Sequence, residues 1–165
     1  MATYYSEGRT NYFRVRDDAA FEAALETMTT KTQDLQTGLA QFTTTETWHR
    51  HSLNRRLLWT DGAQYFADQA EAWWFIDAVA LGVYGKPGPI PLAVPEQDHF
   101  GIVLLDVGDG KATIQVRSDY DENDDTAGHL LWHTPIHSTD CPEGIWKFYL
   151  AAEGEHVVLL TPNEY

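Results

Sequence analysis

The residues of this sequence that could perform acid–base chemistry together are His51, Arg55, Arg56 and Asp77. Apolar periodicity places the first three on one predicted helix, and Asp77 in the middle of the aromatic face of the next helix. Burying a carboxylate without a partner costs on the order of several kcal/mol. We therefore expect Asp77 to be mostly buried and held by Arg55 or Arg56 in a structural ion pair. The alternative is an enzyme with a dispersed site, in which Asp77 acts beside Arg55 and His51.

A basic and aromatic stripe is the second candidate site. At about 100° per residue, five side chains of the first predicted helix share one face: Trp48, His51, Ser52, Arg55 and Trp59. Such a stripe could bind anions or nucleobases. Because the chain as a whole is acidic, we instead expect the tryptophans to belong to the core, with the arginine stem packed over them.

Three histidines, His129, His133 and His137, have a spacing that invites comparison with a metal site. Their surroundings predict a β-strand, on which residues four positions apart lie about 13 Å from each other. The ligand nitrogens of a zinc site must each lie about 2 Å from the same ion. We therefore expect no metal here, and no other motif indicates a cofactor.

The segment 119–125, Asp-Tyr-Asp-Glu-Asn-Asp-Asp, begins like a calcium-binding loop. Asp124 stands where such a loop needs glycine, and Leu130 stands where it needs its final glutamate. We therefore expect a solvated acidic loop rather than an EF-hand.

Cys141 is the single cysteine of the chain, so an internal disulfide is impossible and a reducing compartment is indicated. The sequence contains neither a G-x-S-x-G nucleophile motif nor a glycine-rich phosphate loop. It offers no recognisable catalytic constellation and favours a protein that is not an enzyme.

The net charge of −14 is unevenly distributed along the chain. Residues 1–60 carry seven acidic and seven basic side chains, whereas residues 61–165 carry 18 acidic and 4 basic ones. An acidic surface repels nucleic acid and anionic lipid, and it attracts a basic protein surface; the alternative is that the acidity serves solubility alone. The carboxylates expected to bind a partner are Asp119, Asp121, Glu122, Asp124, Asp125, Asp61, Asp68 and Glu71.

Length and composition predict a single α+β domain over residues 1–165. Its first part, residues 1–37, is expected to hold a strand at 10–16, a helix from Asp18 to about Met28 capped by Asp17, and a polar linker at 29–37. Residues 38–165 are expected to form the acidic core of two helices and a sheet.

Two helices are expected to open this core, over 46–59 and 61–81, the second beginning with a capping box between Asp61 and Gln64. A proline-rich loop at 82–98 should end the second helix. Five strands should follow, at 99–107, 111–117, 129–137, 145–151 and 156–160. We expect an antiparallel meander of about five strands with two or three helices packed on one face.

Several segments of the chain form one recognisable combination: Trp48-His-Arg-His51, Leu58-Trp-Thr-Asp-Gly62, Trp73-Trp-Phe-Ile-Asp77 and Leu159-Leu-Thr-Pro-Asn-Glu-Tyr165. Over about residues 38–165 the sequence resembles a family of small uncharacterised proteins carried by bacterial plasmids, phages and integrated elements. The resemblance implies a genomic setting, and no activity comes with it.

These observations lead to three hypotheses about function. The first is an acidic, non-enzymatic inhibitor from a mobile element, which mimics nucleic acid in the basic groove of a host defence complex, such as a CRISPR surveillance complex or a restriction enzyme. The second is the dispersed-site enzyme described above. The third is a structural or regulatory module that forms homo-oligomers, such as a dimer, through exposed aromatics. The absence of an apolar leader and of a run of about 18 apolar residues predicts a cytoplasmic protein.

Overall fold

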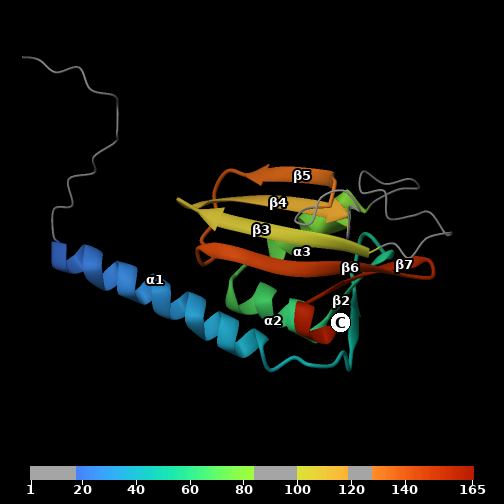
Figure 1. The fold of residues 1–165 in the computed structure, drawn as a ribbon, viewed down its shortest axis with the longest axis horizontal. Coiled ribbons are helices and arrows are strands. Elements are labelled where there is room, and N and C mark those ends of the chain that lie inside the picture. Colours follow the sequence, from blue (N-terminus) through green and yellow to red (C-terminus); the bar gives the residue numbers. More distant parts are fainter. Residues whose placement is uncertain (1–17, 84–99, 119–127) are drawn as a thin grey trace, which may run out of the picture.

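The computed structural model describes residues 18–83, 100–118 and 128–165 (Figure 1). The expected strand at 10–16, the acidic loop at 119–125 and most of the proline-rich loop lie outside the described residues. The helices are α1 (Asp18–Leu39), α2 (Asp61–Gln69), α3 (Trp73–Gly82) and the short 3₁₀-helix η1 (Pro162–Glu164). The strands are β1 (Trp48–Arg50), β2 (Leu57–Thr60), β3 (Phe100–Gly108), β4 (Lys111–Ser118), β5 (Leu130–Ile136), β6 (Gly144–Glu153) and β7 (His156–Leu160).

A seven-stranded mixed sheet, in the order β1-β2-β7-β6-β3-β4-β5, organises these elements. Neighbouring strands are antiparallel except β2 and β7, which run parallel. The α+β class and the five C-terminal strands are confirmed. β3, β4 and β5 form the expected meander, but β6 returns to pair with β3, which makes these four strands a Greek key.

An aromatic core lies between the sheet and helices α2 and α3. Along β3 and β4 every second residue is buried, as alternation on a strand requires. Phe66 of α2 and Phe75 of α3 both contact Phe148 of β6, with ring centroids 4.9 Å apart in each pair. Both helices therefore cover the same face of the sheet, and α3 lies behind the sheet in the view of Figure 1.

Helix α1 continues through the segment at 29–37 that was expected to be a linker. Threonines favour helices only weakly, but Thr27, Thr30 and Thr37 each donate a side-chain hydrogen bond to the carbonyl four residues earlier. The end of the helix is fixed by packing, since Leu35 is buried and belongs to the core. Tertiary contact with the domain thus overrides the polar composition.

The segment at 46–59, expected to be a helix, contains the antiparallel strands β1 and β2 instead. β2 lies between β1 and the parallel strand β7, and all four of its residues are buried. Because this segment is not helical, the predicted stripe does not form on one helix face: Trp48, His51, Ser52, Arg55 and Trp59.

The segment at 61–81 is divided into two helices by Ala70–Ala72, where Glu71 has a left-handed backbone with φ of 52°. Helix α2 begins at Asp61 as expected, but its N-cap is Thr60 rather than Asp61, since the hydroxyl of Thr60 accepts from the N–H of Ala63. Gln64, the expected partner in the capping box, accepts from the indole of Trp59. With this break, α2 and α3 each place one phenylalanine, Phe66 and Phe75, in the core.

Candidate functional site

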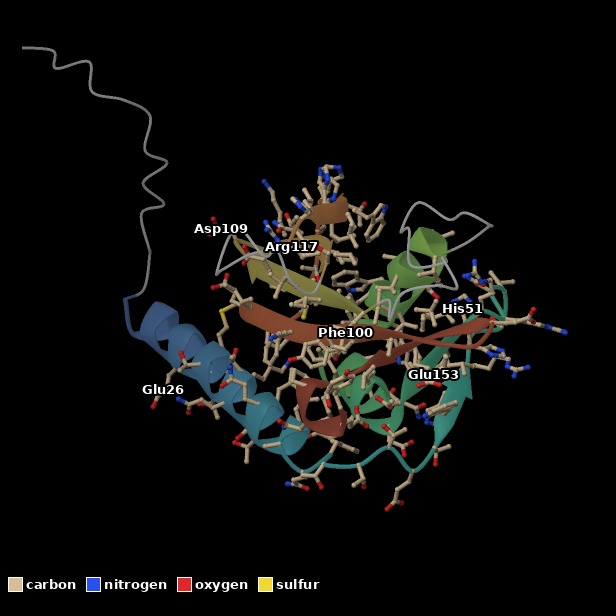
Figure 2. All side chains as sticks on the ribbon, turned by 45° about the vertical axis from the view of Figure 1, so that its right-hand side comes forward. Glu26, His51, Phe100, Asp109, Arg117 and Glu153 are labelled. Carbon is tan, nitrogen blue, oxygen red and sulfur yellow. The ribbon has the colours of Figure 1, made fainter. Side chains whose placement is uncertain are left out.

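Strand β1 directs two histidines toward the helices. Residues two apart on a strand point to the same face, so His49 and His51, which follows the strand directly, lie on one side of the hairpin. His49 contacts Asp61 at the start of α2, and His51 contacts Asp77 in the middle of α3. Figure 2 shows His51 at one end of the molecule, opposite the end that carries Asp109.

The ring of His51 anchors the turn that leads from β1 to β2. Its Nδ1 accepts hydrogen bonds from the backbone N–H of Asn54 (2.9 Å) and of Leu53 (3.3 Å). Nδ1 therefore carries no proton, and Nε2–H donates to Oδ1 of Asp77 at 2.9 Å. Since a neutral imidazole makes this contact, the negative charge of Asp77 is not compensated by it.

The expectation that Asp77 is buried against an arginine is wrong. Its side chain is 69% exposed, and its partner is His51 rather than Arg55 or Arg56. The two arginines belong to a hairpin turn and not to a helix, so no helical face directs them to Asp77. Arg55 is exposed, and Arg56 donates from Nη1 to the carbonyl of Val83 at 3.4 Å.

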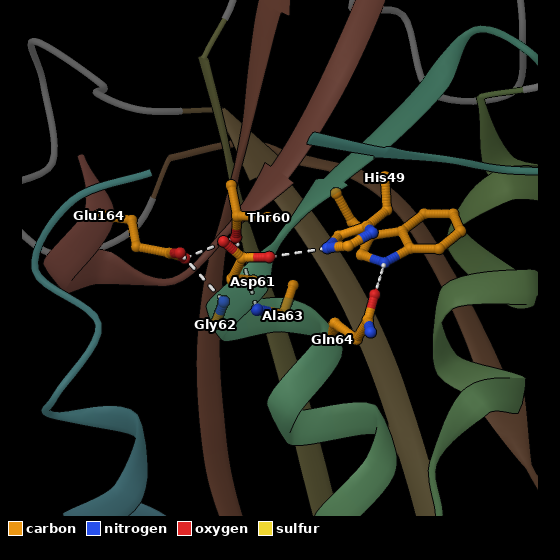
Figure 3. A network of polar contacts seen from close by, with 8 residues as sticks. His49, Thr60, Asp61, Gly62, Ala63, Gln64 and Glu164 are labelled. Atoms are coloured by element: carbon orange, nitrogen blue, oxygen red, sulfur yellow. Dashed lines mark hydrogen bonds and ion pairs between the residues drawn. The ribbon is translucent and has the colours of Figure 1, made fainter. Parts of the chain in front are cut away.

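A second histidine–carboxylate pair closes the start of α2 (Figure 3). Nε2 of His49 lies 2.7 Å from Oδ1 of Asp61, and the imidazole stacks on the indole of Trp59 with ring centroids 6.0 Å apart. The indole N–H of Trp59 donates in turn to Gln64. The edge strand β1 is thereby fixed to the first turn of α2.

Trp59 also packs against Trp73, the first residue of α3. The two rings meet edge to face, with centroids 6.0 Å apart and planes at 77°. The indole N–H of Trp73 donates to Oδ1 of Asp68 at 3.0 Å. This bond joins the end of α2 to the start of α3 across the break between them.

Glu164 from the C-terminal segment completes the network at the N-terminus of α2. Its carboxylate accepts from the hydroxyl of Thr60 (2.5 Å), from the N–H of Gly62 (3.0 Å), and from both the N–H (3.0 Å) and the hydroxyl (2.9 Å) of Thr161. A carboxylate is favoured there by the free N–H groups and by the helix dipole. The Thr-Asp-Gly and Pro-Asn-Glu-Tyr pieces of the sequence pattern therefore meet in space.

Sequence reasoning missed His49 and Glu164. For His49 the available indication was the alternation in Trp-His-Arg-His, which places both histidines on one face of a strand. For Glu164 no local indication existed, because Thr60 lies 104 residues away from it.

The network holds the fold rather than exposing reactive groups. Both ring nitrogens of His51 are engaged, and the carboxylate of Glu164 accepts four hydrogen bonds. Nε2 of His49 forms a hydrogen bond with Asp61. This bond orients the imidazole ring as a carboxylate orients the histidine of a general-base pair. The hydroxyl nearest to Asp61 in sequence, that of Thr60, is engaged by Glu164.

The carboxylates expected to bind a partner are only partly described. Asp68 and Glu71 are exposed, whereas Asp61 is half-buried and engaged by His49. The other five lie outside the described residues: Asp119, Asp121, Glu122, Asp124 and Asp125.

His133 and Cys141 belong to well-defined parts of the sheet and its loops. The expected strand around His133 is β5, where His133 lies opposite Gln115. Within residues 18–83, 100–118 and 128–165, no group of three His, Cys, Asp or Glu side chains has the arrangement of a metal site. Cys141 is buried, and burial raises the pKa of its thiol from 9.0 to about 12.

Comparison with known proteins places the chain in a family. A crystal structure of a protein of unknown function from Enterococcus faecalis matches with 17% sequence identity and a TM-score of 0.39, over 72% of this chain and 98% of that one. No curated protein matches the sequence. None of the described helices is long and apolar enough to cross a membrane. Residues 33–165 match the family of unknown function DUF6876, and the chain therefore belongs to that family.

Proposed function

We propose that this protein is a non-enzymatic acidic inhibitor that binds the basic, nucleic-acid-binding groove of a partner protein. The observation that carries the proposal is the uncompensated charge of its exposed carboxylates. In the described residues 12 acidic side chains are exposed, against 5 basic ones, so the surface is negative. Both ion pairs found there use a histidine rather than a lysine or arginine. Such a surface attracts a positively charged groove.

The polar network supports a binding role over a catalytic one. Two of the side chains that could perform acid–base chemistry, His51 and Glu164, are engaged in fixing the β1–β2 hairpin and the start of α2. The carboxylates of Asp68 and Glu71 are exposed, and Asp68 accepts one hydrogen bond, from the indole of Trp73.

The resemblance to proteins of plasmids, phages and integrated elements supports a partner from host defence. A mobile element benefits when its product occupies the DNA groove of a CRISPR surveillance complex or a restriction enzyme. Duplex DNA presents one charge per about 3.4 Å on each strand, and rows of carboxylates imitate such a track approximately.

Competition for a DNA-binding host protein tests the proposal. The immobilised protein captures its partner from host lysate, and the identified partner is then purified and loaded with labelled duplex DNA. We expect the protein to displace the DNA, and to do so less well as salt rises from about 50 to 200 mM, because screening shortens the range of attraction. A variant with Asp119, Asp121, Glu122, Asp124 and Asp125 neutralised should lose the displacement.

The single substitution Asp109→Asn provides the matched control. Asp109 is exposed at the far end of the molecule from His51, and asparagine tolerates its left-handed φ of 53°. If DNA remains bound to the partner at every salt concentration, the proposal fails. If the neutralised variant displaces DNA as well as the parent, the acidic loop does not act as the mimic.

A further inference from the structure

Exposed apolar side chains flank Asp77 on the outer side of α3. Trp73, Asp77 and Leu81 follow one another at intervals of four residues, so they share one helix face over about 12 Å. Trp73 is 41% exposed and Leu81 is 70% exposed. Apolar surface of this kind with a polar group inside it is typical of an interaction site.

The turn at 51–54 lies beside α3 and carries a further exposed apolar side chain, Leu53, which is 86% exposed. The turn is tied to α3 at two points, through the bond from His51 to Asp77 and through the side-chain amide of Asn54, which donates to the carbonyl of Ala80 at 2.6 Å. We call Leu53, Trp73, Asp77 and Leu81 the α3 patch.

The polar groups of the α3 patch have fixed orientations before any partner binds. The Trp73 ring is held by its bond to Asp68 and by its edge-to-face contact with Trp59. Asp77 is held by His51, whose ring is itself held by backbone N–H groups. Pre-organised groups lose little conformational entropy on binding, which favours affinity.

The charge of Asp77 defines the chemistry of the partner. Oδ1 accepts from a neutral imidazole, and in the described part of the chain Oδ2 has no hydrogen-bond partner. The patch therefore presents one uncompensated negative charge between apolar side chains. A guanidinium group fits this arrangement best, because it binds carboxylates through a planar fork and stacks on indole rings.

We infer that the α3 patch binds an arginine side chain of a partner protein whose neighbouring residues are apolar. The guanidinium group lies between Trp73 and the free oxygen of Asp77, and the neighbouring apolar side chains contact Leu53 and Leu81. The inference rests on the proposed function, in that it assigns a site to the basic partner.

A peptide titration followed by nuclear magnetic resonance tests the inference on the full chain. The probe is a synthetic helical peptide whose single arginine has a leucine one helical turn before it and another one turn after it. The indole N–H signal of Trp73, identified by its loss in Trp73→Phe, should shift on titration. Replacing the arginine by lysine should weaken binding several-fold, and replacing it by uncharged citrulline should weaken it about tenfold or more.

Asp77→Asn is the decisive variant, because asparagine can still accept the hydrogen bond from His51 while it removes the charge. We expect it to weaken peptide binding about tenfold or more, and Leu53→Ser to weaken it several-fold. The matched controls Asp109→Asn and Leu130→Ser should bind like the parent, because Leu130 is also exposed but lies on the opposite edge strand.

The absence of any shift up to about 1 mM arginine peptide would overturn the inference. Equal binding by Asp77→Asn and the parent would also overturn it. If the peptide fails to bind while DNA is still displaced from the host partner, only the α3 patch is wrong. If the peptide binds but DNA is not displaced, the patch stands and the proposed inhibitor function fails.

Discussion

Gly62 determines how closely Glu164 can approach the start of α2. We predict that Gly62→Ala destabilises the protein, although alanine stabilises most helix interiors. A Cβ atom at residue 62 would lie 2.6 Å from Oε2 of Glu164 and 2.9 Å from Cγ2 of Thr161. Glu164 cannot withdraw without breaking the hydrogen bonds from Thr60, Gly62 and Thr161.

The magnitude follows from two opposing effects. Replacing glycine by alanine within a helix gains about 0.5–1 kcal/mol. Losing a helix cap costs about 0.5–2 kcal/mol, and one hydrogen bond to a charged group is worth about 1.5–3 kcal/mol. Because the bonds of Glu164 are lost together and are not additive, their combined cost is about 2–3 kcal/mol. The expected net destabilisation is about 1–2 kcal/mol, which lowers the Tm by about 2–8 °C.

Urea and thermal unfolding followed by circular dichroism measure this effect. Gly108→Ala is the control: a Cβ atom there meets nothing within 4 Å, so the substitution should leave stability unchanged or raise it by up to about 1 kcal/mol. In a Glu164→Ala background, Gly62→Ala should cost less than in the parent. A Gly62→Ala protein as stable as the parent would refute the close approach of Glu164.

Two further predictions concern Cys141 and His51. Burial raises the pKa of the Cys141 thiol from 9.0 to about 12, so the thiol ionises first in the unfolded chain. Its stabilising effect is complete below pH 9 and is lost as pH rises toward 12; Cys141→Ala should therefore show a shallower fall in unfolding free energy over that range, and equal slopes would contradict the burial. His51→Ala should cost about 2–3 kcal/mol in urea unfolding, because it leaves two backbone N–H groups without their acceptor, whereas Asp77→Asn should cost less than about 1 kcal/mol. If His51→Ala and Asp77→Asn lowered the unfolding free energy equally, the imidazole ring of His51 would not anchor the turn.

Much of the sheet could be predicted from the sequence alone. Alternation of apolar and polar residues along 111–118 reflects the two faces of a strand, and this pattern needs no distant partner to be recognised. The turn at Gly108-Asp-Gly110 and the β6–β7 hairpin are likewise local features.

The site was decided by tertiary structure. The segment at 46–59 has a pattern compatible with a helix, but the parallel partner β7 and the buried environment of β2 make it a hairpin. Because this segment is a hairpin, the partner of Asp77 is His51 rather than the expected arginine, and Asp77 is exposed. Glu164 reaches Thr60 across 104 residues of chain. The local sequence determines which backbone conformations have a low free energy for each segment. Only the packed fold determines which residues, distant in the chain, form hydrogen bonds with one another.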